Sequence, residues 1–272
     1  MYILRFDFMS LAFSPLFSGS SGNAVFVGAK DVGVLIDTGL SGSVVESALS
    51  CIGEEARNIK AILITHEHID HIKGAGILSR KYDIPIFANQ ATWDAMRPKI
   101  GEIKEKNICV YTDTDFYIED LCIEAIRTPH DAAMSVGYRV CYKNKSVAVM
   151  TDLGHCTKKI ISHLQNTDIV LLESNHDIGM LNSSRYPRAL KKRILGDNGH
   201  LSNDAAGCAA VELIKNGVKG ILLGHLSEEN NHEELAYNVV YQKLTAANIK
   251  VGRDMALGMA FRKKTAGIFH VK

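Results

Sequence analysis

The chain has 272 residues, and 46% of them are hydrophobic, which is enough to bury a substantial core in a globular protein. Its 31 basic and 30 acidic residues give a formal net charge of +1. No overall field would therefore draw the protein to nucleic acid or to an acidic membrane, and any site for a polyanion must be local.

The amino-terminal stretch, residues 1–13, is apolar but short. Arg5 and Asp7 interrupt it, and no basic leader precedes its apolar residues. We therefore expect neither a signal peptide nor a transmembrane span, and we expect a cytoplasmic protein with no membrane partner. Met9 offers a second start, which would make residues 1–8 an N-terminal extension.

Short runs rich in β-branched residues come next, each followed by a turn or a helical pattern. They are predicted as core strands and comprise residues 24–29, 32–37 and 61–65. Residues 71–82 carry apolar side chains at helical spacing. Residues 84–89 and 90–100 are predicted as a strand followed by a helix, so this part of the chain alternates strand and helix.

The middle of the chain changes character, because apolar runs now follow one another through tight turns such as residues 142–146. This pattern predicts an antiparallel sheet built from residues 108–113, 115–120, 121–128, 134–142 and 145–152. Helix and strand then alternate again. The expected helices are residues 157–166, 185–195, 203–217 and 232–248, and the expected strands are residues 169–174 and 220–225.

The chain shows no linker, because it has only five prolines, no low-complexity tract and no internal repeat. We expect a single domain over residues 1–272, with two sheets covered by helices. The six cysteines form no CxxC pair and are predicted to be buried, reduced thiols: Cys51, Cys109, Cys122, Cys141, Cys156 and Cys208.

Four side chains of metal-ligand type occupy six positions directly after the strand predicted at residues 61–65. They are His66, His68, Asp70 and His71. Imidazole nitrogens and carboxylate oxygens suit zinc, manganese or iron, and the absence of a nearby cysteine argues against a structural thiolate site. The density of these residues favours a metal site over histidines gathered by chance.

Three later residues, His130, Asp152 and His225, also follow apolar strands directly. Taken alone, His130 would more often be an ordinary histidine, and Asp152 a turn or cap residue. Strand ends on one rim of an α/β scaffold are, however, where site residues collect. We therefore expect these three residues and the four of the earlier motif to meet in one site.

This series of motifs, with Asp37 ending an earlier strand, resembles the metallo-β-lactamase superfamily of hydrolases over nearly the whole chain. The resemblance implies an α/β fold, a four-layer αββα sandwich, with two divalent metal ions between the sheets. The implied ligands are His66, His68 and His130 for one metal, Asp70, His71 and His225 for the other, and Asp152 as the bridge. Asp37 would orient these ligands through hydrogen bonds.

Four further stretches resemble the YycJ/WalJ-like branch of that superfamily, bacterial proteins regarded as DNA exonucleases. They are residues 14–24, 171–177, 199–204 and 224–231. The branch implies 5′ to 3′ cleavage of a nucleic acid partner, DNA. The last two stretches are also similar to late motifs of the transfer-RNA 3′-processing nucleases, in which His200 takes the place of the catalytic histidine near the leaving group.

Two features of related nucleases are missing from the sequence. No segment resembles the long flexible arm of the transfer-RNA nucleases. The interval from Asp152 to His225 is also too short for an inserted β-CASP domain.

A cluster of basic residues lies just before His200 and provides a local argument about the substrate. Its members, within nine residues, are Arg185, Arg188, Lys191, Lys192 and Arg193. Helical spacing places Arg188, Lys191 and Lys192 on one face, which could bind phosphate or be an ordinary solvated face. We assign substrate binding to Arg188 and Lys192.

The sequence leaves the roles of several other polar residues undecided. Ser20, Ser21 and Asn23 either border the cleft or form a turn. Glu173 follows another apolar strand and has either a proton-relay or a structural role. We assign Asn175 and His176, which follow the same strand, to substrate binding.

The first functional hypothesis is a metal-dependent phosphodiesterase, a DNA exonuclease, with Asp70, Asp152 and His200 as catalytic residues. The second keeps the metals but acts on a small thioester, lactone or β-lactam. The third is a noncatalytic nucleic-acid or signalling partner with a vestigial metal site. The complete set of seven ligands argues against the third hypothesis.

Overall fold

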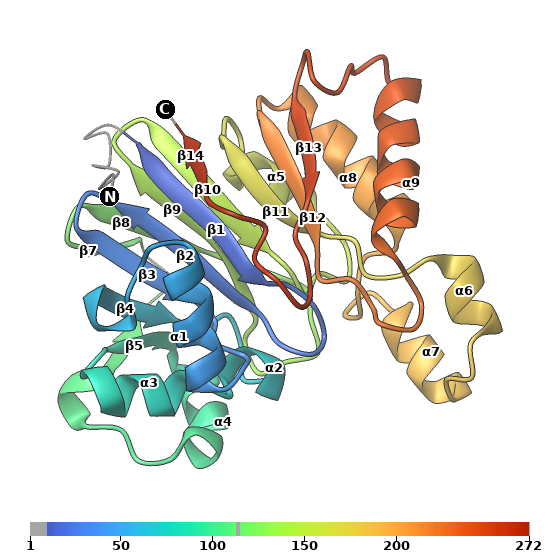
Figure 1. Cartoon of the computed structure of the whole chain (residues 1–272). Helices are drawn as coiled ribbons and strands as arrows, with labels where there is room; N and C mark the ends of the chain where they lie inside the picture. Colours follow the sequence, from blue (N-terminus) through green and yellow to red (C-terminus); the bar gives the residue numbers. More distant parts are fainter. Residues whose placement is uncertain (1–9, 113–114, 272) are drawn as a thin grey trace.

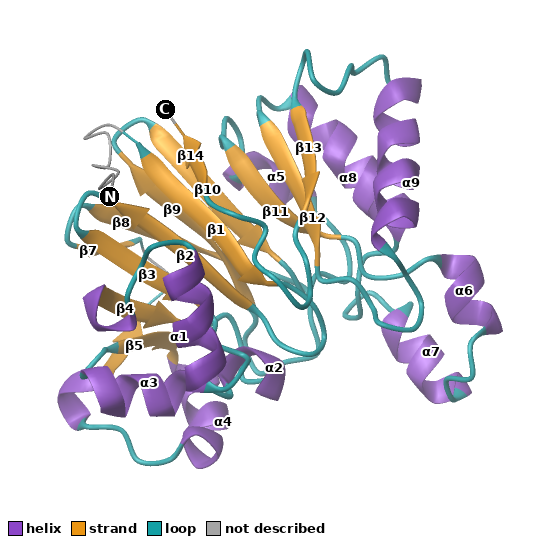
Figure 2. Ribbon diagram, viewed as in Figure 1, coloured by secondary structure: helices purple, strands orange, loops and turns teal. Residues whose placement is uncertain are grey.

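The computed structural model describes residues 10–112 and 115–271, so the extension suggested for residues 1–8 lies outside the described residues. Two seven-stranded sheets lie face to face, and helices cover the outer face of each (Figures 1 and 2). The αββα sandwich expected from the sequence is therefore confirmed.

The first sheet has the order β14-β1-β2-β3-β4-β5-β6. Its strands are β1 (Leu11–Phe17), β2 (Ala24–Ala29), β3 (Val32–Ile36), β4 (Ile59–Leu63), β5 (Ile86–Asn89), β6 (Ile108–Tyr111) and β14 (Phe269–Val271). Strands β3 to β6 pair in parallel, whereas the pairs β14–β1, β1–β2 and β2–β3 are antiparallel. Its outer face packs against α1 (Gly42–Cys51), α3 (Ala75–Tyr82) and α4 (Gln90–Ile100).

The second sheet has the order β13-β12-β11-β10-β9-β8-β7. Its strands are β7 (Phe116–Ile118), β8 (Leu121–Arg127), β9 (Val136–Tyr142), β10 (Lys145–Met150), β11 (Ile169–Glu173), β12 (Gly220–Gly224) and β13 (Ala256–Met259). Strands β7 to β10 form the expected antiparallel part, and β10 to β13 are parallel. The helices on its outer face are α5 (Lys158–His163), α8 (Asn203–Lys215) and α9 (Glu233–Ala246).

The period-2 alternation of each strand decides which side chains meet between the sheets. In β3, Val34 and Ile36 belong to the core between the sheets, whereas Leu35 packs against the helices of the first sheet. In β11, Leu171 belongs to the inner core and Leu172 to the helix layer of the second sheet. Central strands buried on both faces read as continuous apolar runs, which is why they could be located from the sequence.

One expectation about the sheets is wrong. The run at residues 108–113 was expected in the antiparallel sheet, but β6 pairs in parallel with β5 in the first sheet. An apolar run specifies a strand but not its partner, and the crossover through α4 places β6 beside β5. The strands β1, β13 and β14, the helix α1 and the helix at residues 178–183 were not expected from the sequence.

The cysteines are free, as predicted, but none of the six is buried. Cys51 and Cys208 are exposed, and the other four are partly exposed. Cys122 and Cys141 lie opposite each other on β8 and β9, near the edge strand of the second sheet, and the Cys141 thiol donates to Glu124 at 3.4 Å. Their position near a sheet edge explains why they are not buried.

Three short helices lie outside the two helix layers: α2 (Ile69–Ile72), α6 (Ile178–Ser183) and α7 (Arg188–Ile194). Helices α6 and α7 stand clear of the sheets and form what we call the α6–α7 arm, residues 177–199 (Figure 1). No residue of α7 is buried. Within the described ranges, no helix is long and apolar enough to cross a membrane.

Candidate active site

Three residues at strand ends adopt a strained backbone conformation. Asp37 follows β3, Asp152 comes shortly after β10 and His225 follows β12, and their φ angles are 59°, 55° and 55°. Residues other than glycine rarely adopt this left-handed region, and such strain is concentrated at functional sites. All three lie at the rim where the expected site residues lie.

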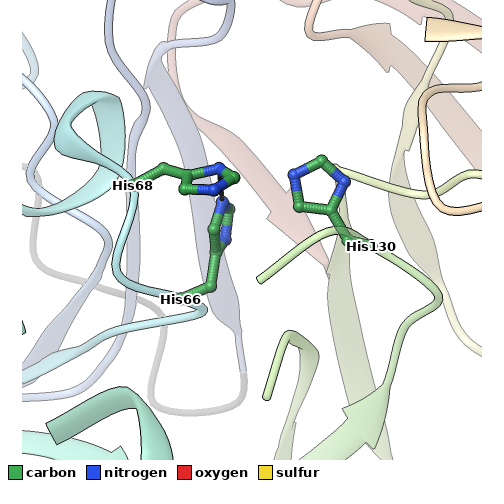
Figure 3. A group of neighbouring side chains, drawn as sticks. All are labelled: His66, His68 and His130. Atoms are coloured by element: carbon green, nitrogen blue, oxygen red, sulfur yellow. Dashed lines mark hydrogen bonds between the residues drawn. The ribbon is translucent and has the colours of Figure 1, made fainter. Parts of the chain in front are cut away.

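The first cluster consists of His66, His68 and His130. Each of the three offers a ring nitrogen within 4.8 Å of the others, and Nε2 of His66 lies 3.0 Å from Nδ1 of His68. The ring of His130, on the loop after β8, faces the other two across the site (Figure 3). Two loops from different sheets thus build a three-nitrogen group.

The second cluster surrounds Asp152. Its Oδ2 atom lies 3.0 Å from Nε2 of His71 and 3.2 Å from Nδ1 of His225, and its Oδ1 atom lies 3.4 Å from Nε2 of His130. Asp70, His71 and His225 form a further group with ligand atoms within 4.8 Å of one another. All seven residues that the sequence grouped as ligands therefore meet here, with Asp152 between the two histidine groups.

Several buried polar atoms in this site have charged neighbours but no well-formed hydrogen bond. Among the described residues, Nε2 of His130, Oδ2 of Asp152 and Nδ1 of His225 have no hydrogen-bond partner. Buried polar atoms in proteins almost always have partners. Convergent imidazole and carboxylate atoms of this kind fit a divalent metal centre.

The protonation states of two histidines and of Asp152 also suit metal binding. Burial lowers the pKa of His66 well below its usual range, and burial also lowers the pKa of His130, so both rings are in the neutral form that binds metal. Burial by itself would raise the pKa of Asp152, but the charges of His225 and His71 hold it well below its usual range. Asp152 is therefore an ionised carboxylate in the middle of the cluster.

Asp37 fixes the orientation of His71. Its Oδ2 atom lies 2.7 Å from Nδ1 of His71, and its carboxylate also accepts from the backbone N and the hydroxyl of Thr65 at 2.9 and 2.8 Å. The other ring nitrogen of His71 thereby faces Asp152. The sequence left the role of Asn23 undecided, and the structure places its amide nitrogen 3.1 Å from Nε2 of His71. Ser20 and Ser21, by contrast, are exposed.

Glu173 and His200 form a pair beside Asp152. Glu173 is fully buried, and its Oε1 atom lies 2.7 Å from Nδ1 of His200, which is itself 3.7 Å from Oδ1 of Asp152. The other oxygen of Glu173 accepts from the backbone of Leu153 and Leu201 at 2.7 and 3.3 Å. Burial lowers the pKa of His200, but the charge and hydrogen bond of Glu173 outweigh burial and raise it to about 9.

The four residues assigned to substrate binding lie in two different places. Asn175 is buried, and its amide donates to the carbonyl of His225 at 2.9 Å. His176 is 1% exposed. These positions favour a supporting role behind the site over contact with substrate. Arg188 and Lys192 are exposed on α7 and form no ion pair with any residue in the described ranges.

Sequence reasoning missed two residues that contact the site. Thr65 bridges Asp37 and His66, with its hydroxyl 3.0 Å from Nδ1 of His66. Asp131 lies with Oδ1 3.4 Å from Nε2 of His130 and pairs with Arg193 of the arm. Both are direct chain neighbours of expected ligands, and that adjacency was the only signal the sequence offered.

The family model of the β-lactamase superfamily domain matches residues 33–225, which is more than half of the chain. The exodeoxyribonuclease YycJ of Bacillus anthracis is 39% identical over 245 residues, covering 90% of this chain and 93% of that protein. The exodeoxyribonuclease WalJ of Streptococcus pneumoniae is 40% identical over 246 residues, covering 89% of this chain and 91% of that protein.

A solved structure supports the same architecture. The metallo-β-lactamase fold protein YhfI from Bacillus subtilis superposes with a TM-score of 0.73 at 16% identity, covering 96% of this chain and 100% of that chain. At this level of identity the likeness concerns the fold alone. It confirms that the αββα arrangement of two mixed sheets is that of a known fold.

Proposed function

The chain belongs to the β-lactamase superfamily, in the branch of the exodeoxyribonucleases YycJ and WalJ, and on that premise we propose that it degrades DNA from an end. Membership in this branch makes it a metal-dependent hydrolase. The observation that carries the proposal is the contact between the Glu173–His200 pair and Asp152, because it joins a proton donor to the metal-ligand cluster.

We assign the cluster to two divalent ions. The first would be held by His66, His68 and His130, the second by Asp70, His71 and His225, with Asp152 shared between them. When bound, such ions supply Lewis-acid activation of a water and charge neutralisation at the phosphate. The nitrogen and oxygen donors accept zinc, manganese or iron, so the donor set does not select one metal.

The residues around the metals would position and protonate the substrate. His200, kept protonated by Glu173, lies beside the cluster and would donate its proton to the departing sugar oxygen. A general acid of this kind contributes roughly 100- to 10,000-fold to the rate. Arg188 and Lys192, exposed on the arm, would hold phosphates further along the strand.

The choice of DNA over other substrates is supported by the two relatives. Both carry the name exodeoxyribonuclease, and both are similar to this chain over about nine tenths of its length. We further propose 5′ to 3′ cleavage and a cytoplasmic location, where DNA is accessible and free cysteines stay reduced.

The proposal is tested by comparing substrates under one set of conditions. Protein loaded with manganese or with zinc is given a DNA oligonucleotide, the matched RNA and a generic thioester, with His68→Ala as the control. Hydrolysis of DNA that His68→Ala lacks supports the proposal. Hydrolysis of the thioester alone would support a small-molecule hydrolase, and equal activity of the variant and the wild type would assign the activity to a contaminant.

A further inference from the structure

Arg193 is the arm residue whose positive charge lies next to the metal-ligand cluster. Its Nε and Nη2 atoms pair with the two carboxylate oxygens of Asp131, the latter at 3.1 Å. Asp131 is in turn 3.4 Å from Nε2 of His130. A single carboxylate therefore separates the guanidinium group from an expected metal ligand.

The pair with Asp131 uses only part of the guanidinium group. Arginine has five N–H donors in one plane. The Nε and Nη2 edge is occupied, whereas within the described ranges the Nη1 group of Arg193 has no partner, and the side chain is 52% exposed. The hydrogen bond and the charge of Asp131 outweigh partial burial and raise the pKa of Arg193. The free donors thus carry full charge close to the site.

The base of the arm is fixed against the rim. The backbone N of Asp131 donates to the carbonyl of Asn198 at 3.1 Å, and the backbone N of His200 donates to the carbonyl of Ile194 at 3.0 Å. Gly154 packs so closely that a Cβ atom there would lie 2.0 Å from the carbonyl oxygen of Asp197. These contacts hold the backbone at the end of α7 beside His200 and beside the loop that carries Asp131.

The other basic residues of the arm do not share this arrangement. Lys191 donates to the carbonyls of Asn182 and Ser184, both at 2.7 Å, and so closes the turn after α6. Arg185, Arg188 and Lys192 are exposed and form no ion pair with any residue in the described ranges. Among the basic residues of the arm, Arg193 alone combines unused donors with a two-pronged pair to Asp131, the neighbour of His130.

From this geometry we propose that Arg193 binds the phosphate group undergoing cleavage through its free edge, while Asp131 fixes the plane of the guanidinium. A planar guanidinium matches two phosphate oxygens at once, which a lysine cannot do. The inference rests on the proposed function, because it requires a phosphodiester substrate. The inference assigns one specific phosphate contact to Arg193, in place of a general attraction between the basic arm and DNA.

The test compares Arg193→Gln and Arg193→Lys in single-turnover cleavage of a DNA oligonucleotide, with metal content measured on each protein. The matched control is Arg253→Gln. Arg253 forms the same two-pronged pair with Asp254, before β13 and therefore at the end of the second sheet away from His225.

We expect Arg193→Gln to lower the rate about 100-fold with metal content unchanged, as for other donors to developing charge. Arg193→Lys should recover part of that loss, Asp131→Asn should show a smaller loss, and Arg253→Gln should behave as wild type.

Wild-type cleavage by both Arg193 variants would overturn the inference and leave the proposed function standing. Absence of DNA cleavage by the wild-type protein would overturn both. If Arg193→Gln loses metal, the test rests on Arg193→Lys, provided that this variant keeps its full metal content. A wild-type cleavage rate in Arg193→Lys would then overturn the specific contact.

Discussion

The Oδ2 atom of Asp37 lies 2.7 Å from Nδ1 of His71, which turns Nε2 of that ring toward Asp152. We expect Asp37→Asn to weaken metal binding about 10- to 100-fold while the fold is kept, because asparagine also tolerates the φ of 59°. Competition with a chelator measures the affinity. Asp83→Asn is the control, since Asp83 has the same φ but lies in the turn after α3. An unchanged affinity in Asp37→Asn would contradict the orienting role.

His200→Ala should lower turnover by about 100-fold or more while the metal content stays intact, because the role proposed for His200 is to donate a proton and not to bind metal. The measurement is single-turnover cleavage together with metal analysis of the same sample. Loss of metal from the variant would show that His200 is a ligand, and the assignment as proton donor would then be wrong.

Glu173→Gln should shift the alkaline limb of the pH–rate profile to lower pH. Burial lowers the pKa of His200, and the carboxylate of Glu173 outweighs it and raises the pKa to about 9, so the protonated donor persists up to that pH. Without the carboxylate charge, burial dominates and the proton is lost at lower pH. Rates of both proteins across the neutral and alkaline range test this, and an alkaline limb at the same pH in both would contradict it.

The sequence could predict that these seven side chains meet because every one of them lies at or just after the end of an apolar run. His130, Asp152 and His225 needed no knowledge of distant contacts, only the rule that strand ends meet at a rim. The pairing of β6 and the edge position of Cys122 and Cys141 depend on which strands become neighbours, and an apolar run does not encode its partner.

The contacts that support the site are harder to predict from the sequence than the cluster itself. Arg193 and Asp131 are 62 positions apart, and neither lies in a periodic pattern that points to the other. His176 follows an apolar strand just as the metal ligands do, yet a bridge to Ser202 draws its backbone inward and the ring is buried. A local pattern places such residues near the rim but cannot tell which of them faces the substrate.

His176→Phe should make the protein less sensitive to acid. Burial lowers the pKa of His176 to about 4, and neither of its ring nitrogens has a partner in the part of the chain that the structure describes. Between about pH 6.5 and 4 the unfolded chain therefore binds more protons at this residue than the folded protein does. As the pH falls, His176 lowers the free energy of unfolding by up to about 3 kcal/mol. Urea unfolding at pH 7 and pH 5 measures the free energy of unfolding of both proteins. Relative to the wild type, the variant should be more stable at pH 5 than at pH 7. An identical difference at both values would refute the prediction.

The most direct test of the central claim is single-turnover cleavage of end-labelled single- and double-stranded DNA by manganese-loaded protein, with Asp70→Ala and His68→Ala run in parallel. We predict stepwise release of mononucleotides from one end by the wild type and by neither variant, with labels at the two ends giving the direction. Intact DNA in every lane would contradict the account, and it would leave the arm as an ordinary solvated surface.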